Sequence, residues 1–128
     1  MPRIAYVNGR YLPHGQAAVH IEDRGYQFSD GVYEVTPVSN RKLVDEELHL
    51  DRLERSLREL RIPMPASRQA IKMITQQVIR RNHLTNGFVY IQVTRGVAPR
   101  DHKFPKNVEP ALAMTARATK PITEQALD

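Results

Sequence analysis

The chain has 128 residues, of which 41% are apolar and 26% charged, and its net charge is +5. These values are those of one ordinary globular domain. No apolar run approaches the roughly 18 residues of a transmembrane helix, and the N-terminus lacks the apolar stretch of a secretory signal. The absence of cysteine excludes disulfides, thiolate catalysis and cysteine zinc sites. Together these features predict a cytoplasmic protein with no membrane partner.

Arginine dominates the basic residues, with 14 of the 19 basic positions. Its planar guanidinium suits carboxylate and phosphate groups. The arginines are scattered among acidic residues, without a basic run or interleaved aromatic residues. We therefore expect no nucleic-acid partner.

The first third of the chain reads as short strands. Ile4–Asn8 alternates as a strand and turns at Asn8-Gly9 into Tyr11-Leu12. Ala17–Ile21 is a weaker strand candidate, and Asp23–Gly31 is predicted to be a loop.

A longer strand is expected at Val32–Val38, turning at Ser39-Asn40 into Lys42–Val44. Pro37 lacks the N–H that a central strand uses in pairing. Its presence implies an edge strand or a bulge.

Two helices should follow. Leucines three and four residues apart give the first helix one apolar face, made of Leu50, Leu53, Leu57 and Leu60. Its other face carries the acid-first pairs Asp51/Arg55 and Glu54/Arg58, and Pro63 and Pro65 end it. Ser67 is a candidate N-cap for the second helix. The apolar face of that helix is Ile71, Ile74, Val78 and Ile79, and Asn86-Gly87 stops it.

Two final strands are predicted at Phe88–Arg95 and Ala111–Ala116. The order of strands, two helices and strands favours an α+β fold, a two-layer sandwich of a mostly antiparallel sheet and two helices. Residues 1–118 would form this domain, and residues 119–128 would begin a linker.

Polar residues on one strand and one helix are candidates for a site. Tyr33 and Glu34 face opposite sides of their strand, because side chains alternate. Tyr33 either offers its hydroxyl to a substrate or fills an amphipathic edge. Arg52, which we expect in the first turn of its helix, either holds a phosphate at the helix N-terminus or belongs to the solvated face. His49 beside it and Tyr90 are, taken singly, consistent with packing roles.

The segment after the strand at 88–95 contains Pro99, Arg100, Asp101 and His102. If the backbone stays extended past Pro99, Arg100 and His102 point the same way. Two such donors suit a carboxylate, as in an amino acid or oxo acid. A solvated charged loop is the alternative.

Three blocks of the sequence together carry a resemblance to a known family: Arg24–Val35, His49–Leu53 and Tyr90–His102. They resemble the class IV pyridoxal-phosphate aminotransferases, most of all those that act on D-amino acids. The resemblance spans nearly the whole chain, in order. It implies amino transfer between a D-amino acid such as D-alanine and a 2-oxo acid such as 2-oxoglutarate.

The resemblance also implies roles for single residues. Arg52 is similar to the arginine that binds the cofactor phosphate. Tyr33, Arg100 and His102 are similar to the residues that bind the substrate carboxylate, the last two coming from the neighbouring subunit of a homodimer. The positions that line or support the site are Glu34, Val35, His49 and Tyr90.

In this family the lysine that forms the Schiff base lies in a second domain, after the linker. No lysine of this chain matches it, so we expect the 128-residue chain to lack the catalytic base and to be inactive alone. Branched-chain aminotransferases and aminodeoxychorismate lyases of the same family remain alternatives. A non-catalytic module that self-associates through apolar faces is another.

Overall fold

The computed structural model describes residues 3–101, 103 and 108–120. Its strands are β1 (Ile4–Val7), β2 (Arg10–Pro13), β3 (Gly31–Ser39), β4 (Lys42–Leu43), β5 (Gly87–Thr94) and β6 (Ala111–Ala118). Its helices are α1 (Arg24–Phe28), α2 (Glu46–Glu59) and α3 (Arg68–Arg81), with a 3-10 turn, η1, at His14–Gln16.

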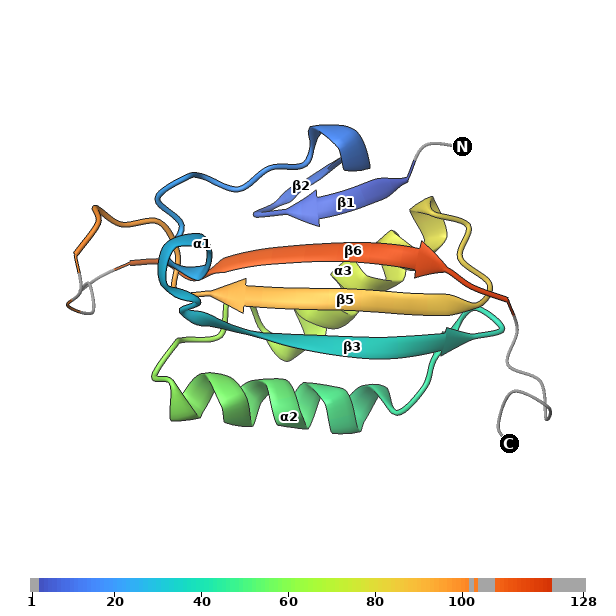
Figure 1. Ribbon diagram of the computed structural model, residues 1–128. Coiled ribbons are helices and arrows are strands. Elements are labelled where there is room, and N and C mark those ends of the chain that lie inside the picture. The colour runs from blue at the N-terminus through green and yellow to red at the C-terminus, as the bar shows by residue number, and fades with distance from the viewer. Residues whose placement is uncertain (1–2, 102, 104–107, 121–128) are drawn as a thin grey trace.

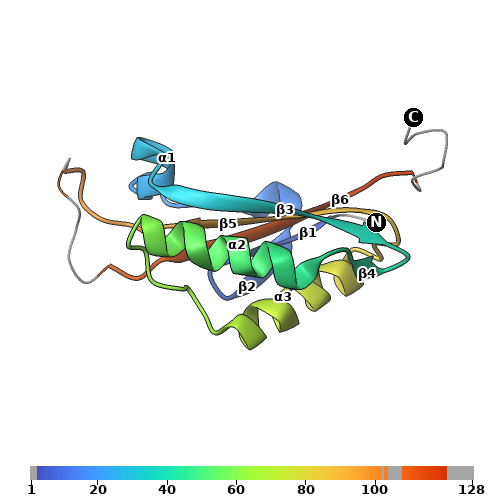
Figure 2. The ribbon, with the colours of Figure 1, turned by 90° about the horizontal axis from the view of Figure 1, so that it is seen from below.

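The six strands form one sheet in the order β2-β1-β6-β5-β3-β4, and every pairing is antiparallel. Helices α2 and α3 lie on one face, and the short α1 lies on the other face at one end (Figures 1 and 2). The predicted α+β sandwich is therefore confirmed. No helix within the described ranges is long and apolar enough to cross a membrane.

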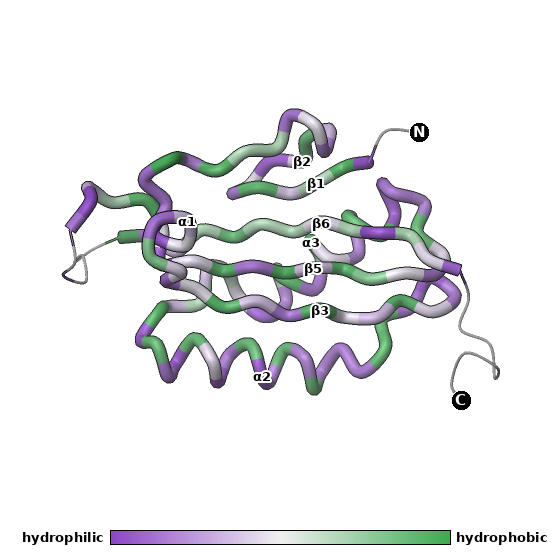
Figure 3. Tube along the Cα trace, in the orientation of Figure 1, coloured by the Kyte–Doolittle hydropathy of each residue, from purple (hydrophilic) through white to green (hydrophobic). Residues whose placement is uncertain are grey.

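The core lies between the sheet and the two long helices. It is built from alternate residues of the strands and from one face of each helix. Its fully buried side chains are Leu53, Leu57, Ile71, Val78, Val89, Val93 and Met114. Along α2, apolar and polar positions alternate as an amphipathic helix requires (Figure 3).

The helix ends differ in part from the predictions. Ser67 caps α3 as predicted, because its side chain accepts a hydrogen bond from the Ala70 N–H at 3.0 Å. The prediction for Leu60 is wrong, since it follows the last helical residue and is 42% exposed. Helix α2 thus ends before the prolines, and α3 ends at Arg81, before Asn86-Gly87.

Acidic side chains on the charged face of α2 form ion pairs with Arg68 at the start of α3. Asp51 and Glu54 lie 2.8 and 3.5 Å from the guanidinium of Arg68. The ion pairs found between described residues do not include the expected pairs with Arg55 and Arg58. Arg68 also binds Glu47, so one arginine joins the two helices at their outer surface.

Strand β3 forms an edge of the sheet over most of its length, since β4 pairs only with Val38 and Ser39. Its register with β5 runs unbroken from Gly31↔Thr94 to Val38↔Gly87. The continuous register shows that there is no bulge at Pro37. Pro37 lies where the open edge of β3 ends, since the Val44 N–H directly after β4 donates to the Pro37 carbonyl at 2.9 Å.

Two local predictions are wrong. The segment 23–31, expected to be a loop, contains α1, capped by the Asp23 side chain on the Gly25 N–H at 2.8 Å. The weak candidate Ala17–Ile21 forms no strand. Tertiary packing of α1 on β5 outweighs the poor helix propensity of Gly25 in so short a segment.

Candidate functional site

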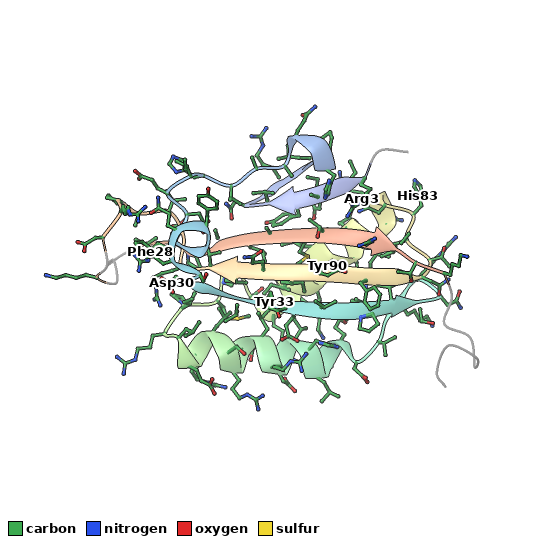
Figure 4. The ribbon with its side chains drawn as sticks, in the orientation of Figure 1. Arg3, Phe28, Asp30, Tyr33, His83 and Tyr90 are labelled. Atoms are coloured by element: carbon green, nitrogen blue, oxygen red, sulfur yellow. The ribbon has the colours of Figure 1, made fainter. Side chains whose placement is uncertain are left out.

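Strand β3 presents candidate residues on both faces of the sheet. Tyr33 is 74% exposed on the face opposite α2 and α3, where Figure 4 shows it beside Tyr90. Glu34 points to the other face, and its side chain is only 7% exposed. The predicted split of these neighbours is confirmed.

Glu34, His49 and Arg52 form one hydrogen-bonded cluster. The Arg52 Nε and Nη2 donate to the Glu34 carboxylate at 2.9–3.0 Å. The His49 Nδ1 lies 2.9 Å from Glu34 Oε1. An ionised carboxylate only accepts, so Nδ1 carries a proton and donates it. Sequence reasoning brought these three residues to one site but did not predict their mutual contacts.

The electrostatics of this cluster favour an ionised Glu34. Burial by itself raises the pKa of a carboxyl group. The hydrogen bonds and charges of Arg52 and His49 outweigh burial and hold the pKa of Glu34 below its usual value. The pKa of Arg52 is raised in turn by Glu34.

Arg52 keeps a surface available for a ligand. Its side chain is 54% exposed although one edge of the guanidinium is bound to Glu34. It borders a shallow surface depression of about 670 Å³ that is lined along α2 by Asp45, Leu48, His49, Asp51, Arg52, Glu54, Arg55 and Arg58. A guanidinium fixed by a buried carboxylate and open to solvent is a suitable donor for a phosphate.

The expectation that Arg52 lies in the first turn of its helix, where it could bind a phosphate together with the helix N-terminus, is wrong. Helix α2 begins at Glu46, so Arg52 lies in the second turn and not the first. The first turn carries Glu46 and Glu47, whose charges oppose an anion there. A phosphate bound on this helix would therefore depend on side chains and not on the helix N-terminus, and among the arginines that line the depression Arg52 is the one held by Glu34.

The open face of the sheet brings other predicted residues together. Two β3 residues, Val35 and Tyr33, are paired with Tyr90 and Gln92 of β5 respectively. Phe88, opposite Pro37, continues the row. Sequence reasoning selected Tyr33, Val35 and Tyr90 but missed Gln92 and Phe88, whose alternation with buried β5 residues was the available signal.

Arg100 lies beyond the end of β5, beside α1. Its guanidinium carbon is 5.7 Å from the centre of the Phe28 ring. Arg100 is exposed, which a ligand-binding role requires. The other predicted member of this pair, His102, lies outside the described residues.

A cluster that the sequence did not reveal lies between these regions. Asp30 Oδ2 accepts hydrogen bonds from Arg24 Nε at 2.8 Å and Arg95 Nε at 2.7 Å. All three side chains are less than 10% exposed. Their charges gave no signal in the sequence, because loops and strand ends are commonly polar. Figure 4 shows Asp30 beside Phe28 at this end of the sheet.

Comparison with known proteins assigns the family. The profile described as "Amino-transferase class IV" matches residues 31–128, which is most of the chain. The chain belongs to the class IV aminotransferases. The resemblance found in the three sequence blocks is thus confirmed.

Curated relatives of this class IV chain are named D-alanine aminotransferase. The protein from Bacillus licheniformis is 40% identical over 119 residues, covering 92% of this chain and 42% of the relative. The protein from Listeria innocua is 39% identical, covering 88% of this chain and 39% of the relative. The protein from Staphylococcus haemolyticus is 35% identical, covering 88% of this chain and 40% of the relative. The chain thus spans about two fifths of the length of these relatives.

Solved structures confirm the fold of this class IV domain. The branched-chain amino acid aminotransferase of Escherichia coli matches with a TM-score of 0.85 at 19% identity, over 93% of this chain and 40% of that one. A branched-chain amino acid aminotransferase from T.th., solved with pyridoxamine 5'-phosphate, matches with a TM-score of 0.87 at 16% identity, over 98% and 43%. The 4-amino-4-deoxychorismate lyase of Pseudomonas aeruginosa matches with a TM-score of 0.72 at 24% identity, over 94% and 42%.

Proposed function

We propose that this chain is part of a D-amino-acid transaminase, which moves an amino group between a D-amino acid and a 2-oxo acid. The observation that carries the proposal is the exposed guanidinium of Arg52, held at the β3 edge by buried Glu34, in a class IV chain. The D-alanine aminotransferases at 35–40% identity favour D-alanine as the amino donor. The 2-oxo acid acceptor, such as 2-oxoglutarate, is what the family resemblance implies.

The cofactor we propose is pyridoxal 5'-phosphate, which when bound supplies an electron sink for cleavage at the substrate Cα. Arg52 would bind its phosphate, since this guanidinium is half exposed and anchored. Glu34 and His49 keep Arg52 in place through the hydrogen bonds described above. The negative charge of the ionised Glu34 is balanced by the Arg52 guanidinium bound to it, so Glu34 does not repel the phosphate strongly.

The substrate carboxylate would be bound by Tyr33, Arg100 and His102. Tyr33 offers an exposed hydroxyl on the open face of the sheet, and Arg100 an exposed guanidinium beyond the strand ends. We propose that Arg100 and His102 act on the site of a neighbouring copy in a homodimer. Val35 and Tyr90 would line the site beside Tyr33.

The lysine that forms the Schiff base would lie outside the 128 residues, as the resemblance implies. We therefore expect the 128-residue chain, purified alone, to be inactive. Turnover of D-alanine by that chain, with any full-length contaminant excluded, would contradict this assignment.

A substrate panel tests the proposal. The complete gene product, supplied with pyridoxal phosphate, should transfer the amino group of D-alanine to 2-oxoglutarate. L-Leucine and aminodeoxychorismate serve as probes for the branched-chain aminotransferase and lyase alternatives. Preferred turnover of either over D-alanine would replace the proposal with that alternative, and inactivity toward all three would favour a non-catalytic module.

A further inference from the structure

We propose that the buried Arg24–Asp30–Arg95 cluster holds Arg100 in the position from which it binds the substrate carboxylate. Arg24 and Phe28 are then positioning residues that act through Arg100. The inference rests on the proposed function, because it assigns a purpose to the geometry of the proposed carboxylate-binding loop.

The cluster is anchored at the end of α2. The Arg95 guanidinium donates to the backbone carbonyls of Leu60 and Arg61 at 2.8 and 3.2 Å. Its Nε donates to Asp30 Oδ2 at 2.7 Å. The Arg95 N–H also donates to the Asp30 carbonyl at 3.0 Å. Through Arg95, the carboxylate of Asp30 is therefore linked both to the end of β5 and to the segment that follows α2.

Arg24 extends this anchor to the loop. Its Nε donates to Asp30 Oδ2 at 2.8 Å, and its Nη1 donates to the backbone carbonyl of Asp101 at 2.8 Å. Asp101 directly follows Arg100, so the bond fixes the backbone at the proposed binding residue. Asp101 and Arg24 are 77 positions apart in the chain.

Phe28 provides a second contact to the same loop. The Arg24 guanidinium lies 4.7 Å from the centre of the Phe28 ring, and that of Arg100 lies 5.7 Å from it. One aromatic ring therefore contacts both the anchored and the exposed arginine. Cation–π contact limits the directions that the long Arg100 side chain can take.

The start of the loop is fixed by the backbone. The backbone N–H of Arg24 donates to the Gly96 carbonyl at 2.8 Å, and the backbones of Asp23 and Val97 form an isolated antiparallel β-bridge. Gly96 has φ +113°, a conformation that L side chains rarely adopt, and a Cβ there would collide with the Glu109 carbonyl. The loop is thus held at Gly96-Val97 and again at Asp101.

The burial of the cluster makes it a rigid support. Two guanidinium groups share one carboxylate, and the three side chains are almost inaccessible. Burial raises the pKa of Asp30, but the hydrogen bonds and charges of Arg95 and Arg24 outweigh burial and lower that pKa below its usual value. Asp30 therefore stays ionised at neutral pH, and both arginines keep their partner.

The test uses the complete gene product with pyridoxal phosphate bound. Arg24→Lys keeps the charge but replaces the guanidinium whose Nε and Nη1 bind Asp30 and Asp101, so both bonds cannot be kept as they are. Phe28→Leu removes the aromatic ring and leaves the side chains of Arg24, Asp30 and Arg95 unchanged. Arg10→Lys and Tyr26→Leu are matched controls at exposed positions. Propionate, a carboxylate that cannot react, is the binding probe, and D-alanine and ethylamine are compared as amino donors with and without a carboxylate.

We expect both variants to raise the inhibition constant of propionate by about tenfold, because a charge-assisted hydrogen bond depends on its geometry. The kcat/KM for D-alanine should fall by a similar factor. Reaction with ethylamine and the affinity for pyridoxal phosphate should stay within about twofold of wild type, since neither involves Arg100. An unchanged inhibition constant in both variants, or equal losses with D-alanine and ethylamine, would overturn the inference.

A double-mutant cycle separates this inference from the proposed function. If Arg24 acts through Arg100, Arg24→Lys has no further effect on propionate binding in an Arg100→Ala background. Additive effects would overturn the positioning role. If Arg100→Ala by itself leaves propionate binding unchanged, the proposed carboxylate site is wrong and the inference fails with it. If Arg24→Lys does not fold, Phe28→Leu carries the same comparison, since it keeps every hydrogen bond of the cluster.

Discussion

Glu34 lies in β3 with its carboxylate almost entirely removed from solvent. A buried carboxylate without partners strongly destabilises a fold. Arg52 and His49 supply these partners, and they outweigh burial so that the pKa of Glu34 falls below its usual value. The same two residues that are proposed to serve the cofactor therefore also stabilise the strand–helix contact.

Replacing Glu34 by Gln should lower the free energy of unfolding by about 2 kcal/mol at neutral pH, because the charge-assisted bonds are lost. The folded-state pKa is below the unfolded one, so this stabilisation is present above about pH 4.5 and is lost as pH falls through the folded pKa. Urea unfolding at pH 7 and at about pH 3 measures the difference. Glu59→Gln, at an exposed position of α2, is the control. A destabilisation by Glu34→Gln that persists undiminished at the lower pH would show that the charge is not responsible.

Arg52 can be tested by a choice between two ligands. If it binds the cofactor phosphate, the complete gene product prefers pyridoxal phosphate to pyridoxal, and Arg52→Met should reduce that preference by about tenfold or more. Arg58→Met is the control, since Arg58 lines the same depression. Binding measured by the change in cofactor absorbance reports the preference. Equal weakening of both ligands would instead indicate a structural role for Arg52.

At the scale of elements, α1 and β5 approach each other closely. Gly25 leaves no space for a Cβ, which would collide with Thr94 Cγ2. Thr94 also accepts a hydrogen bond from the Gly96 N–H at 3.2 Å through its hydroxyl. Helix α1, β5 and the start of the Arg100 loop are therefore packed as one unit, and glycine is required by contact and not by backbone conformation.

Gly25→Ala should destabilise the protein by about 1–3 kcal/mol, as over-packing does. The double variant Gly25→Ala/Thr94→Ser removes the colliding methyl group but keeps the hydroxyl, and should recover part of the loss. Thermal unfolding of wild type, both single variants and the double variant measures the coupling. Purely additive effects of the two substitutions would show that this contact does not limit the packing of α1.

At the scale of the whole molecule, the sheet is covered unequally. Helices α2 and α3 cover one face, while in the described part of the chain the other face carries no long helix, and Tyr33 and Tyr90 are exposed there (Figures 2 and 4). Tyr33 lies on this open face, and Arg100 lies beyond the end of β5. The proposed homodimer would join Tyr33 of one copy with Arg100 of another into one carboxylate site.

Mixing two inactive variants tests this arrangement. Tyr33→Ala and Arg100→Ala of the complete gene product should each lose most turnover of D-alanine. After dissociation and reassociation of the mixture, hybrid dimers contain one intact site, and about a quarter of all sites should recover. Remixing each variant with itself is the control. No recovery, with hybrid dimers demonstrated, would place both residues of a site in the same copy.

The main helices and strands and the family could be predicted from the amino-acid sequence. Alternation of apolar residues in β3 and β5, and leucines three and four apart in α2, are local patterns that a short window of sequence contains. The blocks around Tyr33, Arg52 and Arg100 carried the resemblance that the family match confirms. The N-cap role of Ser67 could likewise be predicted, because its hydrogen-bond partner, Ala70, is only three residues away in the sequence.

The partners of the charged side chains could not be predicted from the sequence and follow from the three-dimensional fold. Arg68 pairs with Asp51 and Glu54 across two helices, where the sequence favoured pairs within α2. Glu34 meets Arg52 from another element, and Arg24 reaches a carbonyl 77 residues away. Ionic and hydrogen-bonded contacts depend on distance in space, and charged residues of the same type look alike in a sequence. Arg24, Asp30 and Arg95, to which the sequence assigned no role, are therefore placed by the fold in one cluster beside the loop that carries Arg100.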